Sequence, residues 1–242
     1  MAKSNDNGYV EQGPESEISR NDGKVWYIPH HGVYHPRKAK LRVVFDCSAE
    51  YLDVSLNDHL LHGRNLATKL HSMLLRFRKE PVAIMGDNES MLYQVEVPEK
   101  HKDFLRFYWW PKGDSNIEPK VFRMTVHWFG AISSPACANM ALRQVIIDSQ
   151  GLCDDEVMKC ISEYFYVDDC LKSVPMPKGA IDMIMDLKDL CKRGGFNLRD
   201  CISNRKDVLE LIPVEDRIHQ MDTLGLDIQT GFHVMEFGGA SD

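Results

Sequence analysis

The chain has 242 residues, of which 43% are apolar and 27% charged, and its formal net charge is −7. These values are ordinary for a globular protein, and the length suits one large domain or two subdomains with a shared core. No apolar run approaches the roughly 20 residues that cross a bilayer, so we expect no membrane partner. The acidic balance does not by itself favour nucleic-acid binding, although basic residues cluster at positions 37–42.

The seven cysteines form no C-x-x-C pair and no zinc-ligand spacing. An odd number also argues against a closed set of disulfides, and thiols within apolar runs behave as small hydrophobic groups. We therefore expect a reduced, intracellular setting, in the cytoplasm or the nucleus. Residues 1–24 are polar and lack the apolar core of a signal peptide, so they are expected to form a flexible leader.

In the first third of the chain, residues 25–29 read as a short extended segment. The three histidines between positions 30 and 35 are expected in a loop punctuated by Gly and Pro, and no fourth ligand supports a metal site there. Residues 41–45 are β-branched and predict a strand. Apolar residues at helical spacing predict an amphipathic helix over 66–77, which ends before Pro81.

The middle of the chain alternates between strands and turns. Residues 82–85 predict a buried strand, and residues 91–97 a second one. The aromatic segment 104–110 and residues 121–128 predict a hairpin or lobe around a turn at 111–114. The rings of 104–110 suit either the core of that lobe or the stacking of bases.

The last part of the chain is richer in helices. Ser134, followed by a proline, predicts a helix start, and helices are expected over 134–149, 155–160 and 179–193, with strands over 197–202 and 223–228. Hairpins outnumber regular βαβ units throughout. The sequence therefore predicts an α+β fold with an antiparallel sheet.

Two adjacent carboxylates, Asp168 and Asp169, stand between the apolar runs 163–167 and 170–174. Both runs predict short strands, which places the acidic pair at the tip of a β-hairpin. Adjacent like charges repel each other, and a bound cation relieves that repulsion.

A third carboxylate follows the predicted strand 82–85 at Asp87. One Asp at a strand end and two at a neighbouring hairpin tip form the arrangement that holds two Mg²⁺ ions about 4 Å apart for phosphoryl transfer. The plainer alternative is a hairpin turn with solvated Asp residues and an unrelated Asp at a strand end, because turns favour Asp.

An ordered series of motifs runs along most of the chain: residues 40–46 (KLRVVFD), 56–58 (LND), 76–78 (RFR), 105–110 (LRFYWW), 129–135 (FGAISSP), 166–170 (YVDDC) and 194–196 (GGF). The series resembles the reverse transcriptase domain of BEL/Pao long-terminal-repeat retrotransposons over about residues 25–230. Tyr-x-Asp-Asp alone is a weak signal, and the specificity lies in the order of the whole set.

The resemblance implies a right-hand polymerase: a palm, with an antiparallel sheet and helices on one face, and a fingers subdomain. It implies fingers at 25–80 and 99–130, palm at 81–98 and 131–230, and a tail at 231–242. No counterpart of the thumb, protease, RNase H or integrase of a full polyprotein is expected in this chain.

The resemblance further implies the site residues. Asp87, Asp168 and Asp169 fall on the catalytic carboxylates that hold two Mg²⁺, or Mn²⁺, and the backbone carbonyl of Asn88 adds a metal ligand. Template with primer, as RNA or DNA, and a dNTP are the implied partners, along with the other polyprotein domains.

Contacts to the dNTP are implied for residues of both fingers segments and of the first palm segment: Lys40, Arg42, Leu92, Phe129 and Gly130. Primer and template contacts are implied for Tyr166 and for Leu224-Gly225, which resembles a primer grip. The family usually carries Phe or Tyr where this chain has Leu92, and that ring rejects a ribose 2′-hydroxyl. The smaller side chain leaves sugar selection open.

Three functions compete at this point. The first is RNA-directed DNA polymerisation by two-metal nucleotidyl transfer from dNTP to a primer 3′-hydroxyl. The second is a catalytically inactive retrotransposon remnant that at most binds nucleic acid. The third is a cyclase-like use of the same two metals on a free nucleotide, against which the motifs for template handling argue.

Overall fold

The structure, a computed structural model, describes residues 7–14, 16, 18, 20, 22–35, 40–64 and 69–217. The chain divides into two compact units, each built from two stretches of sequence. Unit 1 comprises residues 1–65 and 92–138, and unit 2 comprises residues 66–91 and 139–242. Among the described residues, none of the helices has the length and apolar character that crossing a bilayer requires.

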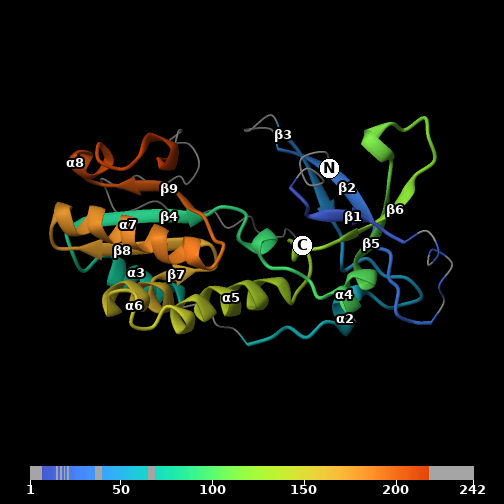
Figure 1. Ribbon diagram of the computed structural model, residues 1–242, viewed down its shortest axis with the longest axis horizontal. Helices are drawn as coiled ribbons and strands as arrows, with labels where there is room; N and C mark the ends of the chain where they lie inside the picture. The colour runs from blue at the N-terminus through green and yellow to red at the C-terminus, as the bar shows by residue number, and fades with distance from the viewer. Residues whose placement is uncertain are drawn as a thin grey trace. The chain divides into compact units, whose positions relative to one another are not determined.

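Unit 1 contains a three-stranded antiparallel sheet in the order β1-β6-β5 and a two-stranded antiparallel sheet, β2-β3 (Figure 1). The strands are β1 (Val10–Gln12), β2 (His30–His35), β3 (Lys40–Phe45), β5 (Arg106–Trp109) and β6 (Lys120–Met124). The short helices are α2 (Leu56–His59), η3 (Met91–Gln94), α4 (Glu99–Lys102), η4 (Asp103–Leu105) and η5 (Pro111–Gly113). All residues of these strands and helices belong to unit 1, except Met91, the first residue of η3, which belongs to unit 2.

Two expectations for unit 1 are wrong. The histidines at 30–35 lie in a strand, β2, because every residue of that stretch pairs with one of β3 and Gly32 fits opposite Val43. Residues 91–94 form a 3₁₀ turn in place of a strand, directly after Ser90, whose φ of 54° breaks the extended backbone. Only the end of that stretch is extended, where Val97 donates to the Thr125 carbonyl.

The core of unit 1 is aromatic. Phe107 is fully buried and contacts the ring of Phe45, and Trp128 packs on the same ring from another side. Tyr108 of β5 is exposed, since alternate residues of a strand face opposite sides of the sheet, and Trp110, directly after β5, is exposed as well. The aromatic segment therefore supplies lobe core on one side only.

Unit 2 is built on a four-stranded antiparallel sheet in the order β7-β8-β4-β9. Its strands are β4 (Val82–Asn88), β7 (Phe165–Tyr166), β8 (Asp169–Val174) and β9 (Leu198–Ser203). Its helices are α3 (Leu70–Phe77), α6 (Asp155–Glu163), α7 (Pro177–Arg193), α8 (Lys206–Leu209) and η6 (Val214–Asp216). Helix α5 (Ser134–Asp148) begins in unit 1 and ends in unit 2.

Helices cover both faces of this sheet, where one face was expected (Figure 1). Leu171 packs with Met73 of α3, whereas the preceding residue of β8, Cys170, lies against Cys160 of α6. Successive residues of a strand point to opposite faces, so α3 and α6 lie on opposite sides. Helix α7 packs against β4, β8 and β9.

The ends of the elements follow from local chemistry. Asp154 accepts a hydrogen bond from the Glu156 amide and so caps α6 at its N-terminus. Pro177 occupies the first turn of α7, and Gly195, with a φ of 78°, follows its last turn. The strand predicted over 223–228 lies outside the described residues.

Candidate active site

The three predicted carboxylates come together in unit 2, at one end of the four-stranded sheet. Asp87 of β4 pairs directly with Asp169, the first residue of β8. Asp168 lies in the two-residue loop between β7 and β8, because Tyr166 pairs with Asp169. The Asn88 amide donates to the Asp168 carbonyl over 2.9 Å and ties this loop to β4. The predicted hairpin is confirmed.

The loop itself is strained. Val167 has a φ of 57°, a conformation that is uncommon for any side chain and an outlier for a β-branched one. Such a residue costs on the order of 1–3 kcal/mol and persists only where its surroundings fix it. Pairing on both sides of the loop and the bond from the Leu171 amide to the Tyr164 carbonyl supply that constraint.

The electrostatics of the three carboxylates are unfavourable. Burial, followed by the charges of Asp168 and Asp169, raises the pKa of Asp87 to about 7. Burial and the Asp168 charge raise the pKa of Asp169 to about 6, and burial also raises the pKa of Asp168. Within the described part of the chain, no Lys, Arg or His lies within ion-pair distance of these groups. Among the described residues, these carboxylates therefore have no counter-ion.

The donor atoms suit a hard cation. Carboxylate oxygens are the preferred ligands of Mg²⁺, which is usually held by one or two carboxylates together with substrate phosphates. Among residues that the structure describes, no group of three His, Cys, Asp or Glu side chains is positioned to hold a metal ion by itself. A site that shares its ions with a triphosphate needs fewer protein ligands, so the types of residue present fit Mg²⁺ chemistry.

The opposite face of the sheet behind Asp87 is apolar and packed. Asn88 is 1% exposed, and its side-chain amide lies beside the Cys191 thiol, whose pKa burial raises. Neither amide atom of Asn88 has a hydrogen-bond partner of normal geometry. The thiols of Cys160 and Cys170 lie 4.0 Å apart in the same layer. These buried thiols act as small core groups.

In unit 1, contacts with Phe45 and Asn57 fix the backbone of the segment Phe129-Gly130. Gly130 has a φ of 117°, and a Cβ there would lie 2.6 Å from the Phe45 carbonyl oxygen, so the position requires glycine. The Asn57 side chain donates to the Gly130 carbonyl over 3.1 Å and accepts from the Ile132 amide. Phe129 is held 62% exposed as a result.

Asn57 is a residue that sequence reasoning missed as part of a site. It belongs to the motif at 56–58, but its role becomes visible only from its contacts across 73 positions of sequence. Neither its type nor its neighbours along the chain indicate that partner.

The other predicted dNTP contacts in unit 1 lie on β3 and η3. Lys40 pairs with His35, and Arg42 pairs with Val33 and is exposed. The side chain of Lys40 lies outside the described part of the structure. Leu92 is buried, with 3% of its surface exposed.

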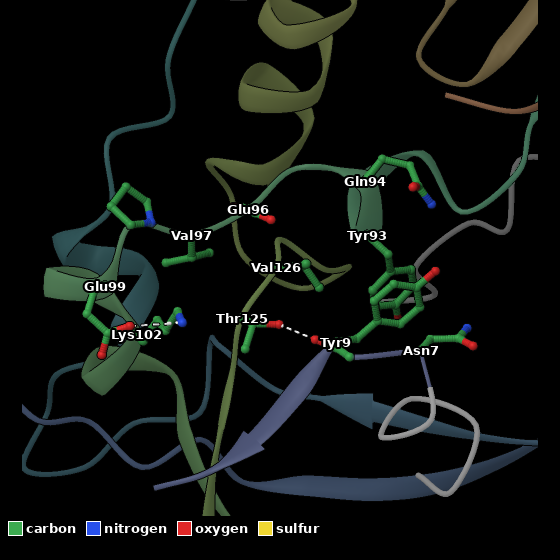
Figure 2. A pocket seen from close by; sticks show the side chains of 12 residues that line it. Asn7, Tyr9, Tyr93, Gln94, Glu96, Val97, Glu99, Lys102, Thr125 and Val126 are labelled. Carbon is green, nitrogen blue, oxygen red and sulfur yellow. Dashed lines mark hydrogen bonds and ion pairs between the residues drawn. The ribbon is translucent and has the colours of Figure 1, made fainter. Parts of the chain in front are cut away.

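The neighbour of Leu92, Tyr93, stacks on Tyr9 with ring centroids 4.9 Å apart. This stack forms one wall of a cavity of about 740 Å³ within unit 1 (Figure 2). Figure 2 shows the amides of Asn7 and Gln94 flanking the two rings, with Glu99 and Lys102 on the far side. No sequence pattern predicted this cavity.

Of the two predicted primer contacts, Tyr166 lies in β7 and packs beside Met85 and Leu171, on the same face of the sheet as Asp169. Leu224 and Gly225 lie outside the described residues.

Comparison with known proteins identifies the fold. The structure is similar to that of the prototype foamy virus protease–reverse transcriptase, with a TM-score of 0.59 and 14% sequence identity over 81% of this chain. A native form of the same enzyme gives 0.57 and 16%, and a foamy viral protease–reverse transcriptase in complex with double-stranded DNA gives 0.57 and 15%. The chain therefore has a mixed helix and antiparallel-sheet fold like that of a retroviral reverse transcriptase.

The similarity covers only 22% to 28% of the length of those proteins. No protein-family model matches the sequence, and no curated protein matches it significantly.

Proposed function

We propose that this chain is the fingers and palm part of an RNA-directed DNA polymerase, from the polyprotein of a BEL/Pao-type retrotransposon. One observation carries the proposal: three carboxylates, with no counter-ion among the described residues, meet at the end of a sheet in a reverse-transcriptase-like fold. Unpaired carboxylates that raise each other's pKa are typical of sites that bind cations or move protons.

Asp87, Asp168 and Asp169 are the residues that would hold two Mg²⁺ ions, or Mn²⁺, together with the backbone carbonyl of Asn88. When bound, the ions supply activation of the primer 3′-hydroxyl and neutralise the triphosphate and the leaving pyrophosphate. The hairpin of β7 and β8 fixes two of the carboxylates against β4, which prepays the cost of bringing like charges together.

The dNTP contacts proposed for unit 1 rest on the residues at its surface. Arg42 is exposed and suits the paired oxygens of a phosphate, and Lys40 supplies a second charge from the same strand. The exposed ring of Phe129, held by Gly130 and Asn57, is an apolar surface for a base or sugar. Leu92, being buried, offers no ring to reject a 2′-hydroxyl.

The wider assignments belong to the same proposal. Template with primer and dNTP are the substrates, and protease, RNase H and integrase domains are the partners within a full polyprotein. The described cysteines are all unpaired thiols, which suits an intracellular setting, in the cytoplasm or the nucleus.

Primer extension tests this function. With an RNA template, a DNA primer, Mg²⁺ or Mn²⁺ and dNTPs, we expect the chain to extend the primer and Asp168→Asn to abolish extension. Asp186→Asn, an exposed carboxylate on α7, is the matched control and should leave extension unchanged. Extension that survives Asp168→Asn, or no extension by the unaltered chain, would contradict the proposal.

The inactive remnant is the second candidate, and the buried Leu92 favours it. A remnant would bind primer–template with an affinity that falls steeply with salt, and would show no extension with either metal.

A further inference from the structure

Asp87 has a cationic residue directly across the sheet on its other side. On β9, Arg199 pairs with Asp87, and the next pair, Asn88 with Leu198, is buried. Paired residues of antiparallel strands point to the same face, with Cβ atoms about 5 Å apart. Arg199 and Asp87 therefore lie on the same face of the sheet, as direct partners of β9 and β4.

The guanidinium of Arg199 is nevertheless engaged elsewhere. Its Nη1 donates to Oε2 of Glu89 over 3.0 Å, and its Nη2 donates to the Glu215 carbonyl over 3.2 Å. Glu89 is itself held in place, because the Asn197 side chain donates to the same Oε2 over 3.0 Å. The Glu89 amide also donates to the Asn197 carbonyl.

We propose that Glu89 is a positioning residue that holds Arg199 away from Asp87 and so keeps the carboxylate site open to cations. The inference rests on the proposed metal site, which it deepens. A guanidinium released from Glu89 would be free to turn toward Asp87, its partner across the sheet, in competition with the charges of Asp200 and Asp216 that also act on Arg199. An Arg–Asp pair there would occupy the oxygens that a metal ion needs.

Mn²⁺ binding, measured by isothermal titration on the full chain, tests this role without requiring activity. Glu89→Gln should weaken binding by about threefold to tenfold, as expected when a partly exposed ion pair competes with the metal. Arg199→Gln alone should leave the affinity within about twofold of the unaltered chain, because the native guanidinium is already sequestered. The double variant Glu89→Gln/Arg199→Gln should recover the native affinity.

The pattern across the variants separates this role from simple loss of charge. If Glu89 acted only through its distant charge, Arg199→Gln would tighten Mn²⁺ binding by the same factor with or without Glu89, and that result would overturn the proposal. Glu210→Gln removes an exposed carboxylate of the same unit and is the matched control, with no change expected.

A second measurement needs no metal. Thermal unfolding of a double-mutant cycle between Arg199→Gln and Asp87→Asn should show little coupling in the native chain and clear coupling in the Glu89→Gln background. Equal coupling in both backgrounds would overturn the role of Glu89. Failure of the native chain to bind Mn²⁺ would contradict the proposed function instead, and the unfolding cycle would still decide the role of Glu89.

Discussion

Asp103 in unit 1 and Asp87 in unit 2 are both largely removed from solvent, and their surroundings are opposite. Asp103 accepts hydrogen bonds from Arg106, Arg123 and Arg20, at 2.9 to 3.2 Å. Burial alone would raise the pKa of Asp103, but the bonds and charges of Arg106 and Arg123 lower it. Around Asp87, burial and the neighbouring carboxylates act together and raise the pKa to about 7.

The contrast separates an acid with a structural role from the acid that is proposed to bind metal ions. The Asp103 cluster joins Arg20 to the β5–β6 sheet and places each Arg in an ion pair with Asp103, with Arg106 fully buried. In the Asp87 cluster, the carboxylates have no cationic partner among the described residues. A fold tolerates such a cluster where a bound ligand balances the charge.

The largest effect is expected at Asp103. Asp103→Asn leaves the buried Arg106 guanidinium without its counter-charge and should destabilise the chain by about 3 kcal/mol, measured by urea unfolding. Asp207→Asn, which breaks the exposed pair with Arg205, is the control and should shift the unfolding midpoint far less. Similar shifts for the two variants would mean that the Asp103 cluster is not a buried structural unit.

The second effect is smaller and of opposite sign: substitution of Asp87 should stabilise the metal-free chain at alkaline pH. Its folded pKa of about 7 lies above the unfolded value of 3.8, so the folded protein binds the extra proton. The stability that this provides is present below about pH 4 and is lost as pH rises to about 7. Metal-free Asp87→Asn should therefore exceed the native chain in stability at pH 8 by about 1–2 kcal/mol, discounted for partial solvent access.

The measurement is thermal or urea unfolding in a chelator at pH 8 and at pH 4.5, where the advantage of Asp87→Asn should shrink. An advantage that is equal at both pH values would show that the carboxyl group at position 87 is not under electrostatic strain.

The two clusters also differ in how far the sequence predicts them. The hairpin around Asp168 follows from apolar runs on either side of an acidic pair, and the strand before Asp87 follows from its β-branched, apolar composition. Those signals are local, and the structure confirms the hairpin and extends the strand through Asn88. The conformation of His30–His35 was mispredicted because pairing with β3 outweighs the Gly and His content of that stretch.

Local sequence patterns do not predict which residues pair across a sheet. Nothing near Arg199 in the sequence indicates that it faces Asp87, since the pairing arises from the order β8-β4-β9 and a register shift between Met85 and Asp87. The Asp103 cluster likewise joins residues up to 83 positions apart, and charged residues of that kind usually form solvated faces. Long-range ionic contacts were therefore the part that the sequence could not supply.

The central claim, that Asp87, Asp168 and Asp169 together bind divalent cations, is tested most directly by calorimetric titration of the chain with Mn²⁺ at pH 7.5. We predict saturable binding that Asp169→Asn weakens by at least about tenfold, because it removes one of the paired carboxylates, while Asp186→Asn leaves it unchanged. Equal Mn²⁺ affinity in the native chain and in Asp169→Asn would contradict the account.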